Sequence, residues 1–120
     1  MGFIFVALGG AVGAIMRYSI SLLPDRTCFP ILTLITNIIG AIVIGFIVGL
    51  AEEKQVSSNA MLFLKTGVCG GFTTFSTFSL EAVTLFDHEK FVLGGIYIIL
   101  SVSACIVGVY CGRKIATMML

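Results

Sequence analysis

The chain has 120 residues, of which 58% are apolar and 11% are charged, with a net charge of +1 and a mean hydropathy of +1.15. A soluble domain carries about 25% charged residues, and a chain this short has too little interior to bury so much apolar surface. The remaining apolar surface must therefore face lipid. The near-neutral charge disfavours a nucleic-acid partner, and the sequence contains no phosphate-binding loop or dinucleotide motif.

Four apolar runs occupy almost the whole chain. A membrane-spanning helix needs about 20 mostly apolar residues, and the runs cover residues 3–23, 31–51, 61–86 and 91–112. Only helices or closed barrels satisfy their backbone hydrogen bonds in lipid, and these runs are too long and continuous for barrel strands. The sequence therefore predicts an all-α integral membrane protein, with residues 1–120 forming a single domain of four transmembrane helices.

The first run contains closely spaced glycines and one arginine. Gly9 and Gly13 are four residues apart, and small residues at this spacing let helix backbones approach closely in lipid. Arg17 lies about two thirds of the way along the run. It either extends its side chain to the membrane surface or places a fixed positive charge near an ion pathway.

The second run has no charge but contains a polar pair. Thr33 and Asn37 are four residues apart, so a helix places them on one face. The amide of Asn37 has two N–H donors and one carbonyl acceptor. It could bond a neighbouring helix or replace part of the hydration shell of an anion, and its depth within the run favours the second interpretation.

The centre of the third run combines poor helix formers. Gly70 and Gly71 each cost about 1 kcal/mol in a helix relative to alanine, and two β-branched residues, Thr73 and Thr74, follow. The pattern indicates a helix that breaks here. Carbonyl oxygens freed inside the membrane must be buried in protein or meet an ion, although a simple kink remains the alternative.

Aromatic and hydroxyl side chains follow the expected break. Phe75 and Phe78 are three residues apart and share a face. The edge of an aromatic ring is positive, so such a pair could meet an anion weakly enough to release it; ordinary packing is the alternative. In the fourth run Tyr97, Ser101 and Cys105 form a stripe of weak donors at four-residue steps.

The basic residues give a weak orientation signal. Four would lie on one side of the membrane and three on the other: Lys54, Lys65, Arg113 and Lys114 against Arg17, Arg26 and Lys90. Because basic residues near the ends of spans set orientation, this near tie indicates either one weakly signalled topology or a chain that inserts both ways round.

Three segments carry a resemblance to a known family. Residues 9–18, 33–40 and, most specifically, 67–79 resemble motifs of the small fluoride channels of the Fluc/CrcB type, and the resemblance covers nearly the whole chain. It implies an antiparallel homodimer of dual topology in the cell membrane, of prokaryotic type. It also implies two pores per dimer that pass fluoride passively out of the cytoplasm, and a central structural sodium ion that is not transported.

The resemblance also implies roles for individual residues. The backbone carbonyls of Gly70 and Thr73 would bind sodium, and Arg17 would lie at a pore entrance. The anion pathway would contain Asn37, Phe75, Phe78, Tyr97 and Ser101, with Ser76 and Thr77 as further candidates. Tyr97 and Ser101 resemble a track of polar side chains on the family's fourth helix. Cys105 occupies the position of a further hydroxyl group in that track, and a thiol is a weaker donor than a hydroxyl.

Two other functions remain open from the residues. A small proton-coupled exporter of the multidrug type needs a membrane carboxylate, and the candidate, Glu81, lies near the end of the third run. A non-conducting packing subunit would explain the glycine spacing alone. An enzyme is disfavoured, because His88 lies in a charged turn and the sequence shows no nucleophile–base pairing.

Overall fold

A computed structural model describes residues 1–119. Within this part of the chain every regular element is a helix. The elements in chain order are α1 (Gly2–Ser21), α2 (Ile31–Glu53), α3 (Ser58–Met61), the π-helical segment η1 (Leu62–Cys69), α4 (Gly70–Phe72), α5 (Phe75–Asp87) and α6 (Phe91–Met119). The predicted all-α fold is confirmed.

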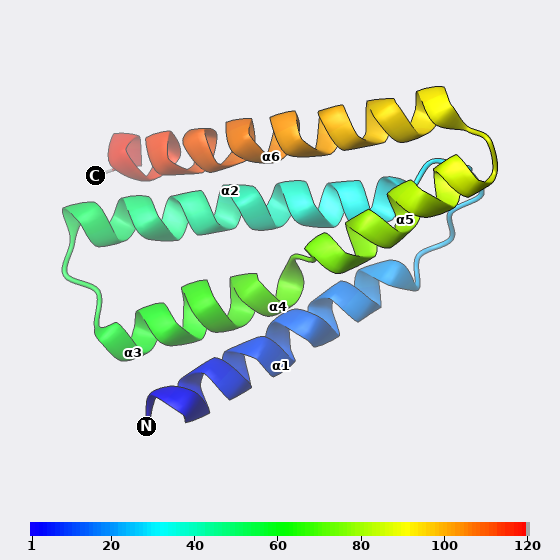
Figure 1. Cartoon of the computed structure of the whole chain (residues 1–120). Helices are drawn as coiled ribbons and strands as arrows, with labels where there is room; N and C mark the ends of the chain where they lie inside the picture. The colour runs from blue at the N-terminus through cyan, green and yellow to red at the C-terminus, as the bar shows by residue number, and fades with distance from the viewer. Residues whose placement is uncertain (120) are drawn as a thin grey trace.

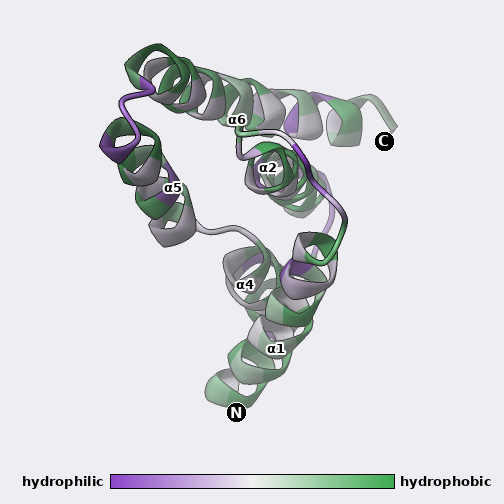
Figure 2. Ribbon diagram, turned by 90° about the vertical axis from the view of Figure 1, so that its right-hand side faces the viewer, coloured by the Kyte–Doolittle hydropathy of each residue, from purple (hydrophilic) through white to green (hydrophobic). Residues whose placement is uncertain are grey.

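Three of these helices, α1, α2 and α6, are long and apolar enough to cross a membrane by themselves. The third predicted span is divided: α3, η1 and α4 form its first half and α5 its second half. The predicted broken third helix is therefore present. Apolar residues dominate the helices, whereas the α5–α6 turn is polar (Figure 2).

The helices form two neighbouring pairs. The α2 and α6 helices lie side by side, while α1 lies against the first half of the third span (Figure 1). Beyond the break, α5 leaves α1 and packs on α6. Both ends of the described chain and the α2–α3 turn lie at one end of the molecule, and the α1–α2 and α5–α6 connections lie at the other (Figure 1).

Glycines allow both helix pairs to pack with their backbones in contact. A Cβ atom added at Gly112 of α6 would lie 2.1 Å from the carbonyl oxygen of Ile42, and one at Gly9 of α1 would lie 2.3 Å from that of Phe63. A real side chain does not fit at such distances. Close backbone packing through small residues, as expected in lipid, therefore fixes both pairs.

The break lies slightly later than the glycines suggest. Gly70 and Gly71 are helical, whereas Thr73 and Thr74 have extended backbone, with φ/ψ of −88°/156° and −149°/124°. Gly71 serves packing instead, because a Cβ atom there would lie 2.5 Å from the carbonyl oxygen of Gly10. The β-branched threonines, which tolerate extended backbone well, form the break itself.

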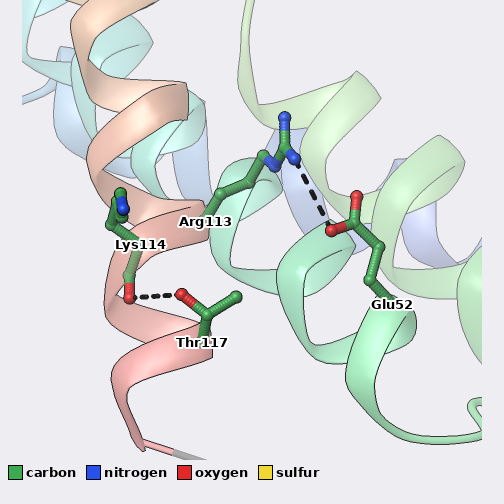
Figure 3. A network of polar contacts seen from close by, with 4 residues as sticks. All are labelled: Glu52, Arg113, Lys114 and Thr117. Carbon is green, nitrogen blue, oxygen red and sulfur yellow. Dashed lines mark hydrogen bonds and ion pairs between the residues drawn. The ribbon is translucent and has the colours of Figure 1, made fainter.

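The last helix continues past its predicted end at Gly112 to Met119. Arg113 lies within this helix, and its guanidinium forms an ion pair of 3.6 Å with Glu52 near the end of α2 (Figure 3). One turn later the Thr117 hydroxyl donates to the Lys114 carbonyl at 2.9 Å. The run of apolar residues stops at Arg113 and Lys114, but the backbone hydrogen bonds of a helix do not require apolar side chains.

Candidate functional site

Asn37 of α2 holds the break in the third span. Its Oδ1 accepts a hydrogen bond from the Thr74 backbone N–H at 2.9 Å, and its Nδ2 donates to the Thr74 carbonyl at 3.1 Å. Thr74 in turn starts α5, because its hydroxyl accepts from the backbone N–H of Thr77 at 3.1 Å. The second N–H of the Asn37 amide takes no part in these hydrogen bonds to Thr74.

Two carbonyl oxygens at the break are satisfied within the chain. The carbonyl of Cys69 accepts from the backbone N–H of Thr73 at 3.1 Å and from its hydroxyl at 2.8 Å. The Gly71 carbonyl accepts from the Nε of Arg17 at 3.1 Å. A cation near the carbonyl end of a helix is favourable, so Arg17 stabilises the end of α4.

Two other carbonyls have no such partner. Within residues 1–119, none of the hydrogen bonds formed around the break ends on the carbonyl oxygen of Gly70 or Thr73. Gly70 also faces open space, because a Cβ atom there would have nothing within 4 Å. The break therefore leaves two carbonyl oxygens without a hydrogen bond from the described residues, and Gly70 beside them is exposed.

Arg17 also lines a small cavity of about 60 Å³ between α1, α2 and α5. Hydroxyl groups surround it, from Ser21, Thr33, Thr36 and Thr77. The side chain is thus fixed inside the protein through Gly71 and does not simply extend to the membrane surface. The cavity brings Arg17 together with Thr77, two of the predicted site residues.

A larger cavity of about 390 Å³ lies beside the break. It brings together five residues of the predicted anion pathway: Asn37, Phe75, Phe78, Ser101 and Cys105. Most of its remaining lining is apolar, from α2 and α6. The Ser101 hydroxyl is buried and has no hydrogen-bond partner, so it is a free donor at the cavity wall.

Tyr97 does not line this cavity. Its side chain is fully buried, with its ring centroid 5.1 Å from that of Phe78. Phe78 is itself 5.4 Å from Phe75, which is 75% exposed. The aromatic side chains therefore form a continuous row from the protein surface into the core. Ser76 is exposed, and its hydroxyl lies 3.2 Å from that of Thr74.

Glu81 belongs to the same region, although its position in the sequence does not by itself place it in the pathway. One carboxylate oxygen accepts from the Tyr97 hydroxyl at 3.0 Å and the other from the Thr33 hydroxyl at 3.0 Å. Its spacing carries a signal, because Phe75, Phe78 and Glu81 recur every three residues on one face of α5. The partners on α2 and α6 become evident only in the folded chain.

The fold and this site define a class: a multi-pass helical membrane protein with a broken span and a partly polar cavity beside the break. Residues 4–113 match the family described as CrcB-like protein, Camphor Resistance (CrcB). The chain therefore belongs to the CrcB-like family, and the resemblance noted from the sequence motifs is confirmed.

Relatives in this family cover nearly the whole chain. The chain is 47% identical to the fluoride-specific ion channel FluC of Ruminiclostridium cellulolyticum over 115 residues, covering 92% of this chain and 88% of the relative. It is 40% identical to FluC of Methanococcus maripaludis, with 92% and 91% coverage. It is 43% identical to FluC of Clostridium perfringens, with 94% and 91% coverage.

Proposed function

We propose that this chain is a fluoride-specific ion channel of the cell membrane that lets fluoride leave the cytoplasm passively. The relatives described above carry that activity in their names. The observation that carries the proposal is the cavity beside the break, where Asn37, Phe75, Phe78, Ser101 and Cys105 converge. No bond is made or broken in such transport, so no enzymatic activity is assigned.

The chemistry of this cavity suits a small, strongly hydrated anion. Such an ion needs donors to replace its water, and the free hydroxyl of Ser101 and the second N–H of Asn37 provide them. The edges of Phe75 and Phe78 add weak positive charge without a full cation. Conduction requires binding that admits an ion and still releases it, and this combination meets both demands.

The smaller cavity fits a pore entrance. The Arg17 guanidinium attracts anions, and Thr33 and Thr77 line the same cavity with their hydroxyl groups. Thr33 also bonds Glu81, which bonds Tyr97. In this proposal Tyr97 supports the pathway from beneath Phe78, and Ser76, Thr77 and Cys105 supply further polar contacts.

The functional unit we propose is an antiparallel homodimer with two pores. Two features support it: the near tie in basic residues between the two sides and the open face at Gly70. Exposed apolar side chains such as Phe75 also leave ample surface for lipid or a second copy.

A sodium ion at the dimer centre fits the carbonyls at the break. Those of Gly70 and Thr73 accept no hydrogen bond from the described residues, and hard cations prefer oxygen ligands. Inverted pairing would give two such sets. When bound, sodium neutralises the carbonyl dipoles, which would otherwise be costly in a membrane, and it is not transported.

Fluoride efflux from liposomes tests the proposal. Purified protein is reconstituted into vesicles loaded with potassium fluoride, and valinomycin balances the charge while a fluoride electrode records release. We expect fast release without a proton gradient and little release from vesicles lacking protein. Vesicles loaded with potassium chloride and followed with a chloride electrode should retain their chloride. Vesicles that retain fluoride would indicate a non-conducting subunit, and release only under a proton gradient would indicate an exporter.

A further inference from the structure

We infer that Phe29, in the loop between α1 and α2, is a positioning residue that keeps Tyr97 hydrogen bonded to Glu81. The inference rests on the proposed function, because Tyr97 and Glu81 border the pathway described above. Phe29 lies outside all helices, and neither cavity of the candidate site is lined by it.

Phe29 completes the row of aromatic rings. Its ring centroid lies 5.4 Å from that of Tyr97, with an interplanar angle of 84°. Edge-to-face contacts of this kind are favourable beyond the area that they bury. On its other side Tyr97 contacts Phe78 at 5.1 Å. The tyrosine ring is therefore held between Phe29 and Phe78, and it has no exposed surface.

The loop fixes Phe29 through its backbone. Asp25 accepts hydrogen bonds from the backbone N–H and the hydroxyl of Thr27, at 3.0 and 2.8 Å. The same Thr27 hydroxyl also lies 2.9 Å from the Phe29 carbonyl, so its single hydrogen is shared between the Asp25 carboxylate and this carbonyl. That carbonyl also accepts from the backbone N–H of Ile31 at 2.7 Å. Phe29 is thus anchored at the start of α2.

The orientation of Tyr97 matters because Glu81 depends on it. Of the two hydrogen bonds that the carboxylate accepts, one comes from Tyr97 and the other from Thr33. A carboxylate within a membrane is costly when its partners are lost. Without the Phe29 ring, Tyr97 gains room to rotate, and Glu81 loses a donor next to the pathway.

Phe29→Leu tests this inference, with Phe91→Leu as the matched control. Phe91 is a largely exposed aromatic residue that packs on Phe86, away from Tyr97. We expect Phe29→Leu to slow fluoride efflux about three- to tenfold, as the loss of an aromatic pair implies. Phe91→Leu should change it less than about twofold, and Phe29→Tyr, which keeps the ring, should restore it.

A double-mutant cycle with Tyr97→Phe separates positioning from general support of the fold. If Phe29 acts through the Tyr97 hydroxyl, Phe29→Leu has no further effect once that hydroxyl is absent. Additive losses, or an unchanged rate in Phe29→Leu, would overturn the inference. Should Phe29→Leu fail to fold, Phe29→Met carries the same comparison with a more adaptable side chain.

Near-ultraviolet circular dichroism provides a readout that does not depend on transport. The chain has three tyrosines and no tryptophan, so Tyr97 contributes directly to the tyrosine signal. Phe29→Leu should weaken that signal, whereas Phe91→Leu should not; an unchanged signal would contradict the inference. If wild-type vesicles retain fluoride, the proposed function fails, while this measurement still tests the Phe29–Tyr97 contact.

Discussion

In the proposed channel, Asn37 would serve both structure and transport. Its amide binds both backbone groups of Thr74, which the break would otherwise leave unpaired inside the membrane. Each unpaired buried group costs about 1–3 kcal/mol. Bonding a neighbouring segment and donating to an anion therefore need not exclude each other. The hydrogen bonds to Thr74 use one of the two amide N–H groups and leave the other.

Ser101 gives the sharpest residue-scale test of the pathway. Its hydroxyl is buried without a partner at the cavity wall, so Ser101→Ala removes a donor without breaking a hydrogen bond. Since a hydrogen bond to a charged group is worth about 1.5–3 kcal/mol, we expect fluoride efflux to fall by at least about tenfold. Thermal stability in detergent should stay the same or rise.

The matched control for that test is Ser103→Ala. Ser103 lies on the same helix two residues later, is exposed and does not line the cavity. Its substitution should leave efflux unchanged. Equal rates for Ser101→Ala and the wild type would remove Ser101 from the anion pathway.

At the scale of elements, the pairing of α1 with η1 depends on glycine contacts. Gly9 lies against the backbone of Phe63, and a Cβ atom at Gly67 would lie 2.7 Å from the Cα of Gly9. We expect Gly9→Ala to destabilise the protein by about 1–3 kcal/mol, because the helices must move apart. Thermal unfolding in detergent, followed by circular dichroism, measures this.

Gly10→Ala is the control on the neighbouring position. A Cβ atom there meets nothing within 4 Å, and alanine is the better helix former by about 1 kcal/mol. The substitution should therefore be neutral or stabilising in the isolated chain. Equal losses from both substitutions would show that the backbone contact of Gly9 does not limit this pair.

At the scale of the whole molecule, sodium should stabilise the dimer. A ligand that binds only the native state stabilises it by about 2.7 kcal/mol at one hundred times its Kd. Replacing sodium with N-methylglucamine at constant ionic strength should therefore lower the Tm of the detergent-solubilised protein and shift it toward monomer on size exclusion. The same Tm in both cations would argue against a sodium site at the break.

The candidate site was only partly predictable from the sequence. The family resemblance implied that Asn37, Phe75, Phe78, Ser101 and Cys105 belong to one pathway, and the fold gathers these five residues around one cavity. Glu81 and Phe29 were missed as parts of the site for a physical reason. Their relevant partners lie on other elements, and nothing local in the sequence specifies which helix faces will meet.

The sequence by itself determined that the chain lies in lipid, that it has four spans, and that the third span has a segment of poor helix formers. These properties follow from hydropathy, length and helix propensity, which act locally along the chain. The tertiary structure decided which polar groups pair with one another inside the membrane. Arg17 reaches a carbonyl 54 positions away, and Thr33 reaches a carboxylate 48 positions away. Such contacts depend on how closely the helices pack, and in lipid that is set by small residues whose partners only the folded chain reveals.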